Sequence, residues 1–134
     1  MAKKIFINLP VSDLQKAMNF YSAIGFTNNP TFTDETAACM VLTEEIYVML
    51  LTHSKFSFFT SKTIIDAKSS AGVINCVSVE SLEDVNRMAG AAVAAGGFEP
   101  KPLMDYGFMQ QRAFEDLDGN LWEVVYMDMS KFPE

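Results

Sequence analysis

The stretch Asp116-Leu-Asp-Gly-Asn-Leu-Trp-Glu-Val-Val-Tyr-Met-Asp128 decides how this sequence is interpreted. Its first part, around Gly119, contains residue types that tolerate positive φ and bond to their own backbone, so it predicts a chain reversal. Residues 121–127 are rich in β-forming side chains and predict a strand. Because side chains alternate along a strand, Glu123 shares its face with apolar neighbours. Such a carboxylate belongs either to a solvent-facing strand or to a pocket, where it binds a metal or moves a proton.

Composition and charge narrow the class of protein. The chain has 134 residues, 49% of them hydrophobic, which is typical of one packed domain. Its formal net charge of −7 disfavours nucleic acid and anionic membrane surfaces as partners. No apolar run approaches the ~20 residues that span a bilayer, and the N-terminus does not have the pattern of a signal peptide. We therefore expect a cytoplasmic protein in which Cys39 and Cys76 are free thiols.

The predicted elements occur twice in the same order. In the first half, a strand at 5–9 precedes a helix with a capping signal at Ser12 and Gln15 and a stop at Gly25, then strands within 26–32, 36–43 and 46–52. In the second half, a strand at 72–79 precedes a helix that starts after Ser81 and stops at Gly96-Gly97, then strands from Phe98, within 106–115 and at 121–127. This repeat predicts an α+β fold with two β-α-β-β-β modules, residues 1–53 and 72–129, in one domain spanning 1–134.

The two modules are expected to curve their mixed sheets around a shared cavity, with the helices outside. Residues 54–71, which join the modules, are too long and too apolar for an inert linker. They predict a short helix or lid, or a contact in a homodimer. A homodimer is also expected because the edges of two sheets favour pairing or cover.

This order of elements resembles the vicinal oxygen chelate superfamily, which comprises glyoxalase I (lactoylglutathione lyase), bleomycin and fosfomycin resistance proteins and extradiol dioxygenases. The residues that carry the resemblance are 9–14, Phe20-Tyr21, Gly25-Phe26 and 114–123. The match covers nearly the whole chain and is closest to the small glyoxalase-like branch. A shared fold does not transfer a reaction, because function depends on the site.

The resemblance implies four metal-ligand positions, which fall here on Phe6, Met49 (Val48 if the alignment is one residue out), Ile74 and Glu123. Only Glu123 is a ligand for a hard cation. Asn8 and Cys76 share a face with Phe6 and Ile74 but lie ~6.6 Å along each strand. The single histidine, His53, is ~13 Å from Met49 along an extended chain. The expected cofactor is therefore none, with a divalent metal as the alternative.

The predicted cavity is mostly apolar with a few polar groups, as small-molecule pockets are. Its lining is expected to contain Phe6, Asn8, Met49, Ile74, Cys76, Gln110, Arg112 and Phe114 together with Glu123. Arg112 is expected to pair with Glu123 across neighbouring strands. That pair either neutralises two charges in a packed core, or it lets Arg112 bind an anionic substrate while Glu123 moves a proton.

Three functions remain open from the sequence. The first is metal-independent binding of a small molecule, as in resistance proteins. The second is a lyase or isomerase of glyoxalase type, or dioxygenase-like activity, in which Glu123 is the catalytic residue. The third is an interaction module whose cavity is filled by its own side chains.

Overall fold

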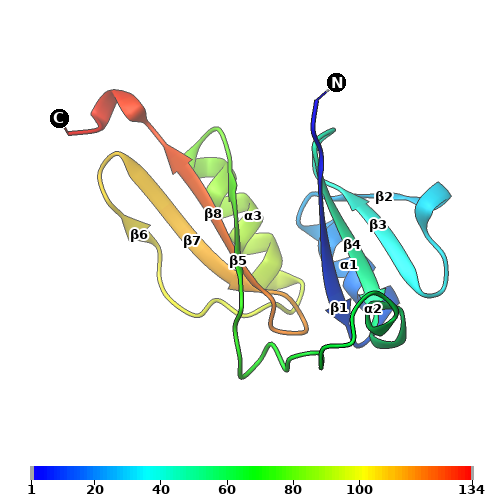
Figure 1. The fold of residues 1–134 in the computed structure, drawn as a ribbon. Helices are drawn as coiled ribbons and strands as arrows, with labels where there is room; N and C mark the ends of the chain where they lie inside the picture. Colours follow the sequence, from blue (N-terminus) through cyan, green and yellow to red (C-terminus); the bar gives the residue numbers. More distant parts are fainter. Residues whose placement is uncertain (1, 134) are drawn as a thin grey trace. The chain divides into compact units, whose positions relative to one another are not determined.

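The computed structural model describes residues 2–133 (Figure 1). The chain divides into two compact units, Met1–Asp66 and Ala67–Glu134, and each contains a β-α-β-β-β module with one four-stranded mixed sheet. The predicted α+β class and the two modules are confirmed. The division falls inside residues 54–71, which we predicted to join the modules.

The first module is organised around the parallel pair of its first and last strands. Its elements are β1 (Ile5–Val11), α1 (Leu14–Ala23), β2 (Thr27–Asn29), the 3₁₀ helix η1 (Pro30–Phe32), β3 (Ala37–Val41) and β4 (Ile46–Thr52). The strand order is β1-β4-β3-β2, and only β1 and β4 are parallel. A short helix, α2 (His53–Phe59), follows β4 directly. A short helix in the joining segment is thus confirmed.

The second module repeats this plan. Its elements are β5 (Ile74–Ser78), α3 (Leu82–Ala94), β6 (Met104–Asp105), β7 (Met109–Glu115), β8 (Leu121–Met127) and the 3₁₀ helix η2 (Met129–Lys131). The strand order is β5-β8-β7-β6, with β5 and β8 parallel. Phe98 forms only an isolated bridge to Glu115, so the strand predicted to begin at Phe98 is wrong.

Each sheet has one face covered by the long helix of its module. Helix α1 packs on β3 and β4, and α3 packs on β7 and β8 (Figure 1). The core lies in these two layers and contains the largest buried side chains: Trp122, Tyr21, Phe20, Phe114, Met40 and Leu50. We call this side of each sheet the helix-covered face and the opposite side the open face. No helix among residues 2–133 has the length and apolar character needed to cross a membrane.

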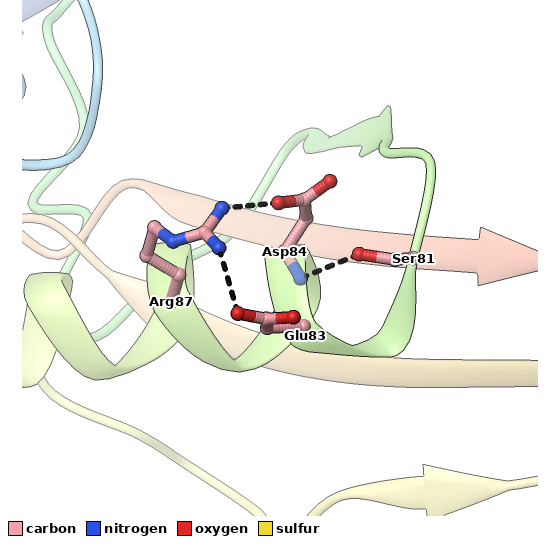
Figure 2. Close-up of polar contacts among 4 residues, drawn as sticks. All are labelled: Ser81, Glu83, Asp84 and Arg87. Atoms are coloured by element: carbon pink, nitrogen blue, oxygen red, sulfur yellow. Dashed lines mark hydrogen bonds and ion pairs between the residues drawn. The ribbon is translucent and has the colours of Figure 1, made fainter.

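The long helices begin at side-chain caps. The hydroxyl of Ser81 accepts a hydrogen bond from the backbone N–H of Asp84 at 3.0 Å, and Arg87 contacts both Glu83 and Asp84 in the next turn (Figure 2). This confirms the predicted cap at Ser81. In the first module the cap is Asp13, whose carboxylate accepts from the N–H of Lys16 at 3.1 Å. The predicted cap at Ser12 is therefore one residue early, because β1 continues through Pro10 to Val11.

Gly119, in the turn between β7 and β8, lies against the backbone at the start of the second unit. It has φ +95°, a conformation that side chains with a Cβ rarely adopt. A Cβ atom there would lie 2.8 Å from the backbone of Ala67 and Lys68. Asp116 organises the turn by accepting from the N–H groups of Asp118 and Asn120 at 3.0 and 2.9 Å. The turn therefore requires glycine for both its conformation and its close backbone contact.

Candidate functional site

The open face of the first sheet brings together three of the predicted site residues. Asn8 and Met49 are directly paired in the parallel register of β1 and β4, and Phe6 is paired with Tyr47. The rings of Phe6 and Tyr47 stack with centroids 4.5 Å apart. Val48 points to the helix-covered face, where it is fully buried. The open face of this module is thus mainly aromatic and apolar.

Helix α2 forms a groove of about 370 Å³ on this open face. Its lining comes from both the sheet and the helix: Asn8, Leu51, Phe56, Phe59 and Thr60. Asn8 donates its side-chain N–H to the carbonyl of Phe6 at 3.2 Å. That bond leaves the amide oxygen of Asn8 as a hydrogen-bond acceptor for a ligand. The groove combines apolar walls with a few polar groups, as small-molecule sites do.

Aromatic side chains of α2 continue out of the groove. Phe58 and Phe59 are 79% and 64% exposed. The ammonium nitrogen of Lys55 lies 5.5 Å from the centroid of each ring, a cation–π distance. His53 is an exposed residue at the start of α2. The sequence of this segment predicted a short helix or lid, or a dimer contact, but none of its residues was among the predicted site residues.

The open face of the second sheet carries Glu123 with two other predicted site residues. Cys76 is registered with Glu123 across the parallel pair of β5 and β8, and Ile74 is registered with Leu121. Cys76 is exposed on this face, and partial desolvation together with the neighbouring Glu123 charge raises the pKa of its thiol. At neutral pH the thiol is therefore mainly protonated, a weak hydrogen-bond donor with little of the reactive thiolate.

The structure corrects the assignment of Gln110, Arg112 and Phe114 to the face of Glu123. Ala113 is the residue paired with Glu123 in the antiparallel register, and Arg112 and Phe114 are paired with Val124 and Trp122. Because directly paired residues point the same way, the three residues lie on the helix-covered face. Phe114 is buried there and stacks with Trp122 at 6.3 Å. A one-residue difference in register moves every side chain of a strand to the other face.

The predicted pair between Arg112 and Glu123 is therefore wrong. Arg112 makes a two-pronged contact with Glu99, with both N–O distances at 2.9 Å, and its remaining nitrogen bonds to Asn86 of α3. The guanidinium group lowers the pKa of the Glu99 carboxyl, and Glu99 raises the pKa of Arg112 in turn. This cluster neutralises its own charges and holds the segment before β6 against the sheet.

Lys101 is the cation that approaches Glu123, and it was not among the predicted site residues. Its ammonium nitrogen is 3.8 Å from Oε2 of Glu123, and the two side chains are 45% and 21% exposed. Lys101 lies between Pro100 and Pro102 in the segment that leads to β6. The Pro-Lys-Pro sequence was the available signal, because two prolines around a charged residue indicate a rigidly held loop.

The residues present do not fit a divalent metal. Of the four positions that the resemblance to the vicinal oxygen chelate superfamily implies as metal ligands, only Glu123 has an oxygen or nitrogen donor. Phe6, Met49 and Ile74 supply none. Across residues 2–133, no group of three or more His, Cys, Asp or Glu side chains converges in a way that could hold a metal ion.

Comparison with solved structures shows which fold this is. A hypothetical protein, SA1046 from S. aureus, superposes with a TM-score of 0.79 at 22% identity, covering 94% of each chain. A glyoxalase/bleomycin resistance protein/dioxygenase family enzyme from Burkholderia phytofirmans PsJN superposes with a TM-score of 0.78 at 17% identity, covering 94% of this chain and 99% of the other. Residues 3–42 match the sequence profile described as bleomycin resistance protein-like N-terminal. This chain therefore has the fold of the glyoxalase/bleomycin resistance/dioxygenase proteins.

Other proteins with this fold differ widely from the chain in sequence. The fosfomycin resistance protein FosX from Mesorhizobium loti superposes with a TM-score of 0.70 at 11% identity, covering 97% of this chain and 96% of the other. No curated protein sequence matches the chain significantly. The shared fold therefore explains the two modules, and the chemistry of the site has to be inferred from the residues described above.

Proposed function

We propose that this protein binds a small, mostly apolar molecule without a metal ion, and that the groove under α2 holds it. The single observation that supports this most strongly is the groove itself, about 370 Å³ in volume and lined by Leu51, Phe56 and Phe59 with the polar groups of Asn8 and Thr60. Aromatic rings supply most of the contact area in such sites, and one or two polar groups orient the ligand. The ligand class is an aromatic or hydrophobic compound with a hydrogen-bond donor that reaches the amide oxygen of Asn8.

The test is a fluorescence titration with N-phenyl-1-naphthylamine, an uncharged aromatic probe. We expect saturable enhancement that EDTA does not change. Phe56→Ala should weaken binding about tenfold, because it removes one apolar wall of the groove. Phe58→Ala is the matched control, since Phe58 lies on the same helix but outside the groove lining. A titration that does not saturate, or an equal loss in both variants, would refute the groove as the site.

A second candidate function is proton transfer by Glu123, in a lyase or isomerase of glyoxalase type. The observation that favours it is a partly buried carboxylate, 21% exposed, next to a protonated thiol on an open sheet face. The probe is the hemithioacetal of methylglyoxal and glutathione. Turnover that disappears in Glu123→Gln, with binding of the naphthylamine probe unchanged, would support this candidate. Equal turnover in the variant and the wild type would exclude it.

A homodimer is a further part of this proposal. The exposed apolar side chains of residues 56–65, among them Phe58, Phe59 and Ile65, are the surface that supports it. Large exposed apolar patches mark association surfaces. Sedimentation velocity should give a dimer at micromolar concentration, and a monomer for the variant carrying both Phe58→Ser and Ile65→Ser. A monomeric wild-type protein would contradict the dimer and leave the ligand-binding proposal intact.

A further inference from the structure

A bulge in the second module carries Lys101. Phe98 and Glu115 exchange two backbone hydrogen bonds of 3.1 and 2.7 Å, and the next paired residues are Met104 and Gln111. Residues 99–103 therefore lie opposite the shorter stretch 112–114 and leave the ladder. Bulges of this kind redirect side chains and are frequent next to functional sites.

The bulge is stiff because of its sequence. Pro100 and Pro102 have fixed φ angles and no backbone N–H for the ladder. Each proline also restricts the backbone of the residue before it, which here is Glu99 or Lys101. The backbone of Lys101 is therefore restricted before a ligand binds, so binding costs little additional conformational entropy there.

The bulge is also anchored on the helix-covered face. Glu99 accepts two hydrogen bonds from Arg112, each 2.9 Å long, and Arg112 also contacts Asn86 of α3. Two-pronged charged contacts between planar groups fix geometry as well as contributing energy. Glu99 therefore fixes the bulge on one face of the sheet, while Lys101 reaches Glu123 on the other.

The contact between Lys101 and Glu123 does not by itself explain why the bulge presents Lys101 in this way. At 3.8 Å the two atoms are too far apart for a direct hydrogen bond. Within residues 2–133, no hydrogen-bond donor reaches the Glu123 carboxylate, although its side chain is only 21% exposed. Partly exposed ion pairs contribute little to stability. A partly buried carboxylate without hydrogen bonds and a rigidly presented ammonium are the two halves of a site for a polar ligand.

We propose that Lys101 and Glu123 bind the zwitterionic head of an apolar α-amino acid on the open face of the second sheet. The ammonium of Lys101 receives the ligand carboxylate, and the carboxylate of Glu123 receives the ligand ammonium. A zwitterion fits because the site has one charge of each sign, so a ligand with a net charge would be repelled by one of them. Ile74 and Leu121 lie on the same face and provide apolar contact for the ligand side chain.

This inference rests on the proposed function only in that an open sheet face takes up a small molecule. The test is a titration with L-leucine, followed by the ¹H–¹⁵N resonances of Cys76 and Glu123. Two analogues each lack one charge: 4-methylpentanoate has no ammonium, and 3-methylbutylamine has no carboxylate. We expect saturable shifts with L-leucine and at least about tenfold weaker binding of both analogues, because each leaves one charged group of the site unpaired.

Variants identify the residues that hold the ligand. Lys101→Met and Glu123→Gln should each weaken L-leucine binding about tenfold, whereas Lys131→Met, in the same unit, should leave it unchanged. Replacing both Pro100 and Pro102 by Ala should weaken it less, because the charges remain and only their presentation is loosened. Retained dispersion of the ¹H–¹⁵N spectrum shows that each variant is folded.

Two results would overturn the proposal. One is the absence of shifts at Cys76 and Glu123 up to the solubility limit of L-leucine. The other is binding that is unaffected by Lys101→Met or by loss of either ligand charge. The naphthylamine titration reports on the groove under α2, whose residues all lie in the other unit, so failure of one site is distinguishable from failure of the other.

Discussion

The two modules share a strand order but equip their open faces differently. In the first, β4 runs directly into α2, and the helix forms an apolar groove against the sheet. In the second, a bulge before β6 that contains two prolines brings Lys101 to Glu123. The corresponding strand of the first module, β2, pairs with β3 without such a bulge. The topology repeats, and the connections between strands determine what each face can bind.

The difference also extends to the way each module is held together. The second module has an internal ion cluster of Glu99 and Arg112 and a turn, around Gly119, that contacts the backbone of Ala67 and Lys68. In the first module, the turn between β3 and β4 is closed by the Thr43 hydroxyl, which accepts from the N–H groups of Glu45 and Ile46. Substitutions can therefore target one module at a time.

The largest effect is expected for Gly119→Ala. The new Cβ would lie 2.8 Å from the backbone of Ala67 and Lys68, and φ is +95°. Strain and steric conflict together should lower the free energy of unfolding by about 3 kcal/mol. Gly107→Ala is the control, with φ +84° and nothing within 4 Å of its Cβ, and should cost about 1 kcal/mol. Urea denaturation measures both, and equal losses would show that the contact with residues 67–68 is unimportant.

Arg112→Met should destabilise the second module by about 2 kcal/mol at neutral pH, because Glu99 keeps its charge and loses both hydrogen bonds. The pH dependence has a definite sign. Arg112 lowers the folded-state pKa of Glu99 below the ordinary value of 4.5. The stability from this pair is therefore present above that value and is lost as the pH falls through the lowered pKa. Between neutral and acidic pH, the urea midpoint should decrease less in the variant than in the wild type. An equal decrease in the two proteins would contradict the role given to this pair.

Each module has one long helix with a side-chain cap, and loss of either cap is expected to lower the free energy of unfolding by the same amount. Asp13→Ala and Ser81→Ala should each cost about 1 kcal/mol, because each removes one acceptor for an otherwise unpaired backbone N–H. Amide hydrogen exchange should increase in α1 for the first substitution and in α3 for the second. Faster exchange in both helices from either substitution would mean that the two units unfold together.

The smallest effect is expected for Arg87→Ala. Arg87 and its partner Glu83 are 64% and 83% exposed, so solvent screens their interaction (Figure 2). The free energy of unfolding should change by less than about 0.5 kcal/mol. This substitution is the surface control for Arg112→Met, since both remove an arginine from the second module. A loss as large as that of Arg112→Met would undermine the role given to the Glu99 cluster.

Much of the fold was predictable because its signals are local. The strands at β4 and β8 and the cap at Ser81 follow from alternation and capping patterns within a few residues. The face of Arg112 was not predictable from its own strand. It depends on the length of the turn at residues 116–120, which sets Ala113 and not Arg112 opposite Glu123. Phe114 is a large apolar residue, which favours a place in the core. It is paired with Trp122, which is also in the core, so both side chains lie on the helix-covered face.

By itself, the sequence determined the two-module plan, the order of its elements and the scarcity of metal-ligating side chains, since periodicity and composition are properties of neighbouring residues. Which charged groups contact each other depends on how the chain folds in three dimensions. Glu99 forms an ion pair with Arg112, and Lys101 approaches Glu123. Helix α2 forms a groove with Asn8 and Leu51. These contacts depend on register and on the path of connecting segments, where a shift of one residue reverses the direction of a side chain.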